Sequence, residues 1–197
     1  MGNSTRERLI ALAGVVAALL PAVDGVAGLA TLTTWYPGRG VLATGAVVAA
    51  LCAVVIGLGA WRRADRTTLA LALSVVLFAL TWLPVPLGLW PISAIALLAS
   101  QALLIAFGVL VARRSTGLTR ITGWSVAAGG IVWLLGGLVT WFGAVPNASQ
   151  ELLGALFVIA PLGMLIGFLA AAVLFAGPLL RPVAQGARYL WSTAEVR

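Results

Sequence analysis

The stretch that decides the fold runs from Ile92 to Ala112 and reads ISAIALLASQALLIAFGVLVA, with Arg113 and Arg114 directly after it. It contains no charged residue and no strict alternation of apolar and polar positions. At about 1.5 Å of rise per residue, a helix of this length matches the roughly 30 Å hydrocarbon thickness of a bilayer. A helix also satisfies its own backbone hydrogen bonds, as lipid requires. The stretch therefore predicts a transmembrane helix that ends at a pair of arginines.

Five further apolar stretches extend this interpretation to the whole chain. The predicted spans cover residues 9–30, 41–60, 67–83, 92–112, 121–143 and 152–178. Of the 197 residues, 62% are hydrophobic and 9% are charged, whereas a soluble domain carries about 25% charged residues. The short alternating segments of a membrane β-barrel are not seen. We predict an all-α, polytopic transmembrane bundle of six helices that forms a single domain, residues 1–197, with no soluble domain.

The arginines predict the orientation of these spans. Arg62 and Arg63 follow the second span, and Arg113 and Arg114 follow the fourth. If six spans alternate, eleven of the 12 basic residues lie on one side of the membrane and only Arg39 lies on the other. Basic residues are retained in cytoplasmic loops, so we expect both termini in the cytoplasm and the protein in the cell membrane. The first span could instead be a cleaved signal peptide, but its apolar run is longer than the usual core of such a peptide.

An internal repeat is visible at an ungapped offset of 51 residues. This offset superposes Arg62 and Arg63 on Arg113 and Arg114, and it aligns residues 57–90 with residues 108–141 at ten identical positions. One interpretation is a parallel duplication of a two-helix unit, as in some transporters. The other is that two hairpins converged because both need basic and aromatic anchors at the membrane surface. The sequence leaves both open.

Three side chains form a candidate intramembrane polar site. Asp24 is the one ionisable residue well inside a predicted span, and Gln101 and Ser100 lie at the centre of the fourth span. A carboxylate or amide within a membrane is costly and is therefore a candidate functional group. The alternatives are that Asp24 reaches water or pairs with Arg39, and that Gln101 bonds a neighbouring helix.

Small residues at four-residue spacing predict close helix packing. Gly163, Gly167 and Ala171 form such a ridge in the sixth span. The ridge predicts contact with another helix, either within the chain, in a homo-oligomer or in a membrane-protein partner. The lipid bilayer is the other expected partner.

Missing residue types exclude several functions. The chain has no histidine and no lysine, and its single cysteine, Cys52, lies inside a span. These absences exclude histidine-ligated metals and haem, a catalytic triad and a lysine Schiff base. We therefore expect no cofactor, no metal and no enzymatic activity. Because the arginines flank apolar spans, we expect no nucleic-acid partner, and the all-arginine usage hints at a GC-rich prokaryotic genome.

Two functions of different class remain. A non-catalytic, membrane-embedded accessory or interaction protein fits the scarcity of polar residues in the spans. A small permease, or a substrate-binding membrane subunit of a transporter, for a small, largely apolar solute fits the repeat and Asp24. The sequence favours the accessory protein slightly, because one acid and one amide are few groups to line a polar pathway.

Overall fold

A computed structural model describes residues 3–30, 38–83, 90–141 and 150–194. These residues form six helices and no strand. The helices are α1 (Asn3–Ala30), α2 (Arg39–Arg62), α3 (Arg66–Leu80), α4 (Trp90–Arg114), α5 (Gly117–Trp141) and α6 (Gln150–Ala194).

Five of the six helices are long and apolar enough to cross a membrane. Their apolar parts are Glu7–Ala30, Arg39–Arg62, Pro91–Arg114, Gly117–Leu138 and Phe157–Gly177. Large apolar side chains on α2, such as Val41, Leu51 and Leu58, are exposed by more than 60%, which is the expected condition for a surface that faces lipid. By the length and hydropathy of its helices, the chain is a multi-pass membrane protein.

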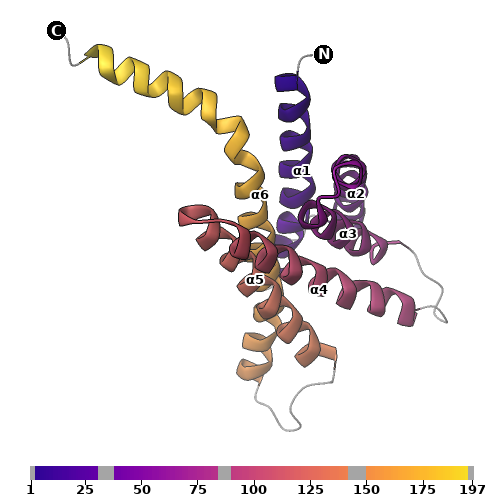
Figure 1. Cartoon of the computed structure of the whole chain (residues 1–197). Coiled ribbons are helices and arrows are strands. Elements are labelled where there is room, and N and C mark those ends of the chain that lie inside the picture. The colour runs from indigo at the N-terminus through magenta and orange to yellow at the C-terminus, as the bar shows by residue number, and fades with distance from the viewer. Residues whose placement is uncertain (1–2, 31–37, 84–89, 142–149, 195–197) are drawn as a thin grey trace.

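The third and sixth helices depart from the predicted limits. α3 has 15 residues and ends at Leu80 rather than at residue 83, so at about 1.5 Å per residue it is roughly 22 Å long. Its end coincides with a hydrogen bond from the Thr81 hydroxyl to the Phe78 carbonyl oxygen, 2.6 Å, which replaces a helical backbone donor. α6 continues past residue 178 to Ala194, and its last part extends away from the other helices in Figure 1.

The helices form a closed ring in chain order. Each helix packs against the next one along the chain, and α6 returns to pack against α1 (Figure 1). The α1–α6 contact is antiparallel, because Gly25 meets Leu165 while Gly14 meets Phe175. An even number of helices with alternating direction closes such a ring without a parallel contact.

The α5–α6 contact is close because glycines face each other across it. A Cβ atom at Gly163 would clash with the backbone of Trp133, and one at Gly129 would clash with the backbone of Gly167. Ala171, one turn further along α6, is fully buried. In this structure, therefore, the predicted ridge of Gly163, Gly167 and Ala171 packs inside the chain.

The centre of the ring is filled by a cluster that we call the aromatic layer, Phe78, Trp133 and Phe168. The ring centroids of Phe78 and Trp133 lie 5.9 Å apart, and those of Trp133 and Phe168 lie 5.6 Å apart, both edge to face. This is a favourable geometry for aromatic pairs. All three side chains are at most 5% exposed, so the layer closes the middle of the ring.

Candidate functional site

A cavity of about 430 Å³ lies on one side of the aromatic layer, and every helix contributes to its wall. We call it the Asp24 cavity. Its lining residues are Asp24 of α1, Arg39 of α2, Phe78, Thr81 and Trp82 at the end of α3, Leu97 of α4, Trp133 of α5 and Met164 of α6. Two aromatic residues of this wall, Phe78 and Trp133, belong to the aromatic layer, which therefore forms the floor of the cavity.

Asp24 and Arg39 give the Asp24 cavity its charge. Asp24 is half-buried and lines the cavity together with Trp82, whereas Arg39 is exposed at the first residue of α2. Pro21, three residues before Asp24, is fully buried within α1. Because proline has no N–H group, one carbonyl of this helix lacks its usual donor. The cavity thus has a carboxylate within it, a guanidinium nearby and an otherwise aromatic and apolar wall.

Ser100 and Gln101 do not line the Asp24 cavity. Ser100 instead forms a reciprocal pair with Ser74 across the α3–α4 contact: each hydroxyl donates to the other residue's carbonyl oxygen at 2.8 Å. Both serines are fully buried. These bonds satisfy polar groups where water is absent and hold the two helices together.

Gln101 lies one helical turn beyond the cavity-lining Leu97. Its amide nitrogen donates a long hydrogen bond, 3.5 Å, to the Trp133 carbonyl oxygen on α5. Its amide oxygen is buried and, among the residues that the structure describes, has no hydrogen-bond partner. The three residues predicted as one polar site are therefore divided: Asp24 lies at the cavity, and Ser100 and Gln101 lie in two separate helix contacts.

A second cavity, of about 230 Å³, lies on the opposite side of the aromatic layer. We call it the Asp65 cavity. Its lining residues are Asp65, Thr67 and Thr68 at the start of α3, Phe107 and Val111 of α4, Thr119 of α5, and Leu174 and Phe175 of α6. The rings of Phe107 and Phe175 stack with centroids 6.5 Å apart.

The polar part of the Asp65 cavity is a helix cap. Asp65 accepts hydrogen bonds from the Thr67 backbone at 3.1 Å and from the Thr68 hydroxyl at 2.6 Å, and Arg114 donates to the Thr67 hydroxyl at 2.8 Å. Partial burial acts to raise the pKa of Asp65, but the bonds from Thr68 and Thr67 and the charge of Arg114 outweigh it. The pKa therefore lies below its ordinary value of 3.8.

The Asp65 cavity was not predicted from the sequence. A signal was present, since Asp65 followed three residues later by Thr68 resembles an ordinary helix start. Thr68 and Thr119, which both line this cavity, are also one of the identical pairs of the internal repeat.

The distance between the two cavities follows from the helices that line both. Phe78 and Thr68 on α3, Leu97 and Phe107 on α4, and Met164 and Leu174 on α6 are each ten residues apart. At about 1.5 Å per residue the separation is about 15 Å. Leu104 and Phe168, both fully buried, lie within this interval.

Chemically, this arrangement is suited to binding. Within the described ranges, no group of three His, Cys, Asp or Glu side chains could hold a metal ion. Cys52 is a free, half-buried thiol on α2. A lone carboxylate beside aromatic rings can recognise a polar group on a small apolar molecule.

Comparison with known proteins gives no match: no family model, curated protein or solved structure matches this chain.

Proposed function

We propose that this protein is a small permease, or a substrate-binding membrane subunit of a transporter, for a small, largely apolar solute. It crosses the cell membrane six times with both termini in the cytoplasm, and it is not an enzyme. The observation that carries the proposal is the pair of cavities on opposite sides of the aromatic layer. A transporter needs a site reachable from each side and a barrier between them.

The arginines support the orientation. Arg62, Arg63, Arg113 and Arg114 are all exposed at the ends of α2 and α4, as expected for residues retained on the cytoplasmic side. In this orientation the Asp24 cavity faces outward and the Asp65 cavity faces inward. α3 is short for a span, and it crosses with its cap at Asp65 on the inner side and Trp82 on the outer side.

Two contacts support duplication of the two-helix unit. Gly57 packs against Ala72 between α2 and α3, and at the offset of 51 residues Gly108 packs against Gly123 between α4 and α5. The equivalent tryptophans Trp82 and Trp133 both line the Asp24 cavity. Parallel repeats that share a central site are an established transporter architecture.

The solute class follows from the wall of the Asp24 cavity. Aromatic and apolar side chains make up most of it, so an apolar body is favoured. Asp24 and Arg39 are the charged groups available to a polar end of the solute. The aromatic layer blocks free passage of the solute between the two cavities.

Access to each cavity can be tested with single cysteines in a Cys52→Ser background. Met164→Cys reports on the Asp24 cavity and Leu174→Cys on the Asp65 cavity, while Leu104→Cys, from the fully buried interval, is the control. The probes are cationic and anionic membrane-impermeant methanethiosulfonates applied to intact cells. We expect Met164→Cys to react from outside, Leu174→Cys to react only after permeabilisation, and Leu104→Cys to resist both.

Charge selectivity provides a second measurement on the same variants. Asp24→Asn should lower the rate of the cationic reagent relative to the anionic one at Met164→Cys, and Arg39→Gln should raise that ratio. Met164 is itself buried, so Leu97→Cys, at a half-buried position of the same wall, is the second reporter. If both cysteines are unreactive from both sides, the Asp24 cavity is not reachable from water. The accessory function would then be the better account of this chain.

A further inference from the structure

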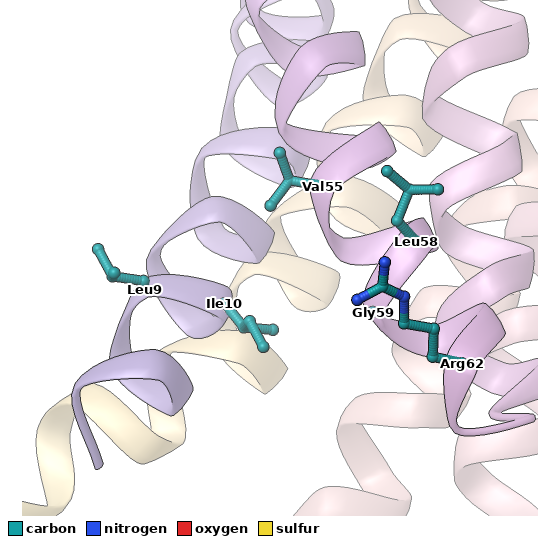
Figure 2. Close-up of a pocket in the computed structure, with 6 residues that line it drawn as sticks. All are labelled: Leu9, Ile10, Val55, Leu58, Gly59 and Arg62. Carbon is teal, nitrogen blue, oxygen red and sulfur yellow. The ribbon is translucent and has the colours of Figure 1, made fainter. Parts of the chain in front are cut away.

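A groove on the lipid-facing side of the ring lies between the start of α1 and the end of α2. It has a volume of about 320 Å³ and is lined by Leu9, Ile10, Val55, Leu58, Gly59 and Arg62 (Figure 2). Leu9, Val55 and Leu58 are each more than half exposed. The groove is therefore open to the membrane along its length.

Arg62 provides the positive charge of the groove. Figure 2 shows its side chain extending back along α2 toward Leu58, so that the guanidinium lies beside the apolar wall. Within the part of the chain that the structure describes, this guanidinium has no hydrogen-bond or ion-pair partner. Arg114, at the corresponding end of α4, differs because it donates to the Thr67 hydroxyl.

The shape and the charge point to one occupant. Arginine at the end of a membrane helix lies at the level of the lipid headgroups, and its planar group binds phosphate oxygens in pairs. Below it, the apolar side chains of α1 and α2 offer a surface for an acyl chain. Gly59 keeps this surface open, since a Cβ atom placed there would meet nothing within 4 Å. Arg8, exposed beside Leu9, adds positive charge at the same end, next to the exposed Glu7.

We infer that this groove binds an anionic phospholipid, with one acyl chain along Ile10, Val55 and Gly59 and the headgroup phosphate on Arg62. Basic pockets between membrane helices commonly select acidic lipids in this way. The inference does not depend on the proposed solute or on the two cavities. It requires only that α1 and α2 lie in a bilayer.

The test uses the purified full chain in a neutral detergent, with phosphatidylglycerol and phosphatidylcholine as probes. Binding is measured by native mass spectrometry across a lipid titration. We expect phosphatidylglycerol to bind more tightly than phosphatidylcholine. Arg62→Gln should weaken the binding of phosphatidylglycerol about fivefold, which is the usual effect of removing one arginine at an anionic membrane surface. Arg63→Gln is the matched control, because Arg63 is the adjacent exposed arginine and does not line the groove.

A second variant tests the acyl-chain surface separately from the charge. Gly59→Leu fills the groove and leaves Arg62 in place, so it should weaken binding of both lipids. Gly40→Leu is its control, because Gly40 is also on α2 and also meets nothing within 4 Å. Far-UV circular dichroism and elution volume verify that each variant is folded.

Three results would overturn the inference. Equal losses of lipid binding from Arg62→Gln and Arg63→Gln would mean that positive charge at the end of α2 attracts the lipid without any role for the groove. Undiminished binding by Gly59→Leu would mean that the acyl chain lies elsewhere. Dimers that disappear in Gly59→Leu, with no lipid preference in the parent protein, would assign the groove to a second copy of the chain.

Discussion

Replacing Gly163 by alanine should destabilise the protein by forcing α5 and α6 apart. The added Cβ atom would clash with the backbone of Trp133 and would also approach Val132 and Gly129. These are backbone atoms of a neighbouring helix, so no side-chain rotation relieves the overlap. Overpacking of this kind costs about 1–3 kcal/mol. This cost directly lowers the free energy of unfolding, because close packing is a main driving force for helix association in lipid.

Gly154→Ala is the matched control on the same helix. A Cβ atom at Gly154 meets nothing within 4 Å, so this change keeps the packing and removes only the flexibility of glycine, and alanine favours a helix over glycine by about 0.5–1 kcal/mol. The free energy of unfolding would be measured in mixed micelles with increasing sodium dodecyl sulfate, followed by circular dichroism. Gly163→Ala should lower it by about 1–3 kcal/mol, while Gly154→Ala should leave it unchanged or slightly higher. Equal stability of the two variants would refute the close α5–α6 contact.

Three further predictions concern polar groups. Ser74→Ala and Ser100→Ala should each lower the unfolding free energy by about 0.6 kcal/mol, the usual size for such bonds in membranes, because each removes a hydroxyl that donates to a backbone carbonyl of the neighbouring helix; no loss from either change would contradict the reciprocal pair. Gln101→Leu should leave stability unchanged or raise it, because the buried amide oxygen has no partner among the described residues and the bond from the amide nitrogen to Trp133 is long, at 3.5 Å; a large loss in thermal unfolding would indicate a missing polar contact. The pKa of Asp65 is lowered in the folded state, so its stabilisation is present above its ordinary value of 3.8 and is lost as the pH falls through the lower folded value. Asp65→Asn should therefore flatten the acid limb of a plot of melting temperature against pH, and an unchanged limb would assign acid sensitivity to another group.

Helix positions could be predicted because lipid imposes a direct length and polarity requirement on each span. Ile92–Ala112 lies within α4, and the pairs Arg62–Arg63 and Arg113–Arg114 lie at or next to the helix ends. The helix ends differ from the span ends at α3 and α6: α3 ends at Leu80, and α6 continues as a helix to Ala194 although its apolar part ends at Gly177, next to the predicted span end at residue 178. Leu83 is apolar but follows a turn closed by Thr81, and residues beyond 178 are less apolar but still helical. Hydropathy measures solubility in lipid, whereas helix ends also depend on hydrogen bonds.

The candidate site could be predicted only in part. In a soluble helix the apolar face marks the core, but here both faces are apolar: Ile56 is buried while the adjacent Val55 is exposed. Hydrophobicity therefore does not distinguish the inside of the ring from its lipid-facing side. Small residues mark the packed face instead, as Ala46, Ala49 and Ala53 do on α2. The sequence singles out Asp24 as the one ionisable residue well inside a predicted span, but its distance from Gln101 depends on how α1 and α4 sit across the ring.

The ring geometry explains how a chain so poor in polar residues can hold two separate cavities. Glycines at Gly129, Gly163 and Gly167 bring α5 and α6 together near the middle of the ring, where Trp133 and Phe168 then meet. Bulkier side chains there would separate the helices and open the layer, so the same contact that stabilises the fold also closes the path between the cavities. On this argument, variants that loosen the α5–α6 contact should lose the barrier before they lose the helices. Leu104→Cys would then become reactive toward the methanethiosulfonates in a Gly163→Ala background while the helical circular dichroism signal persists.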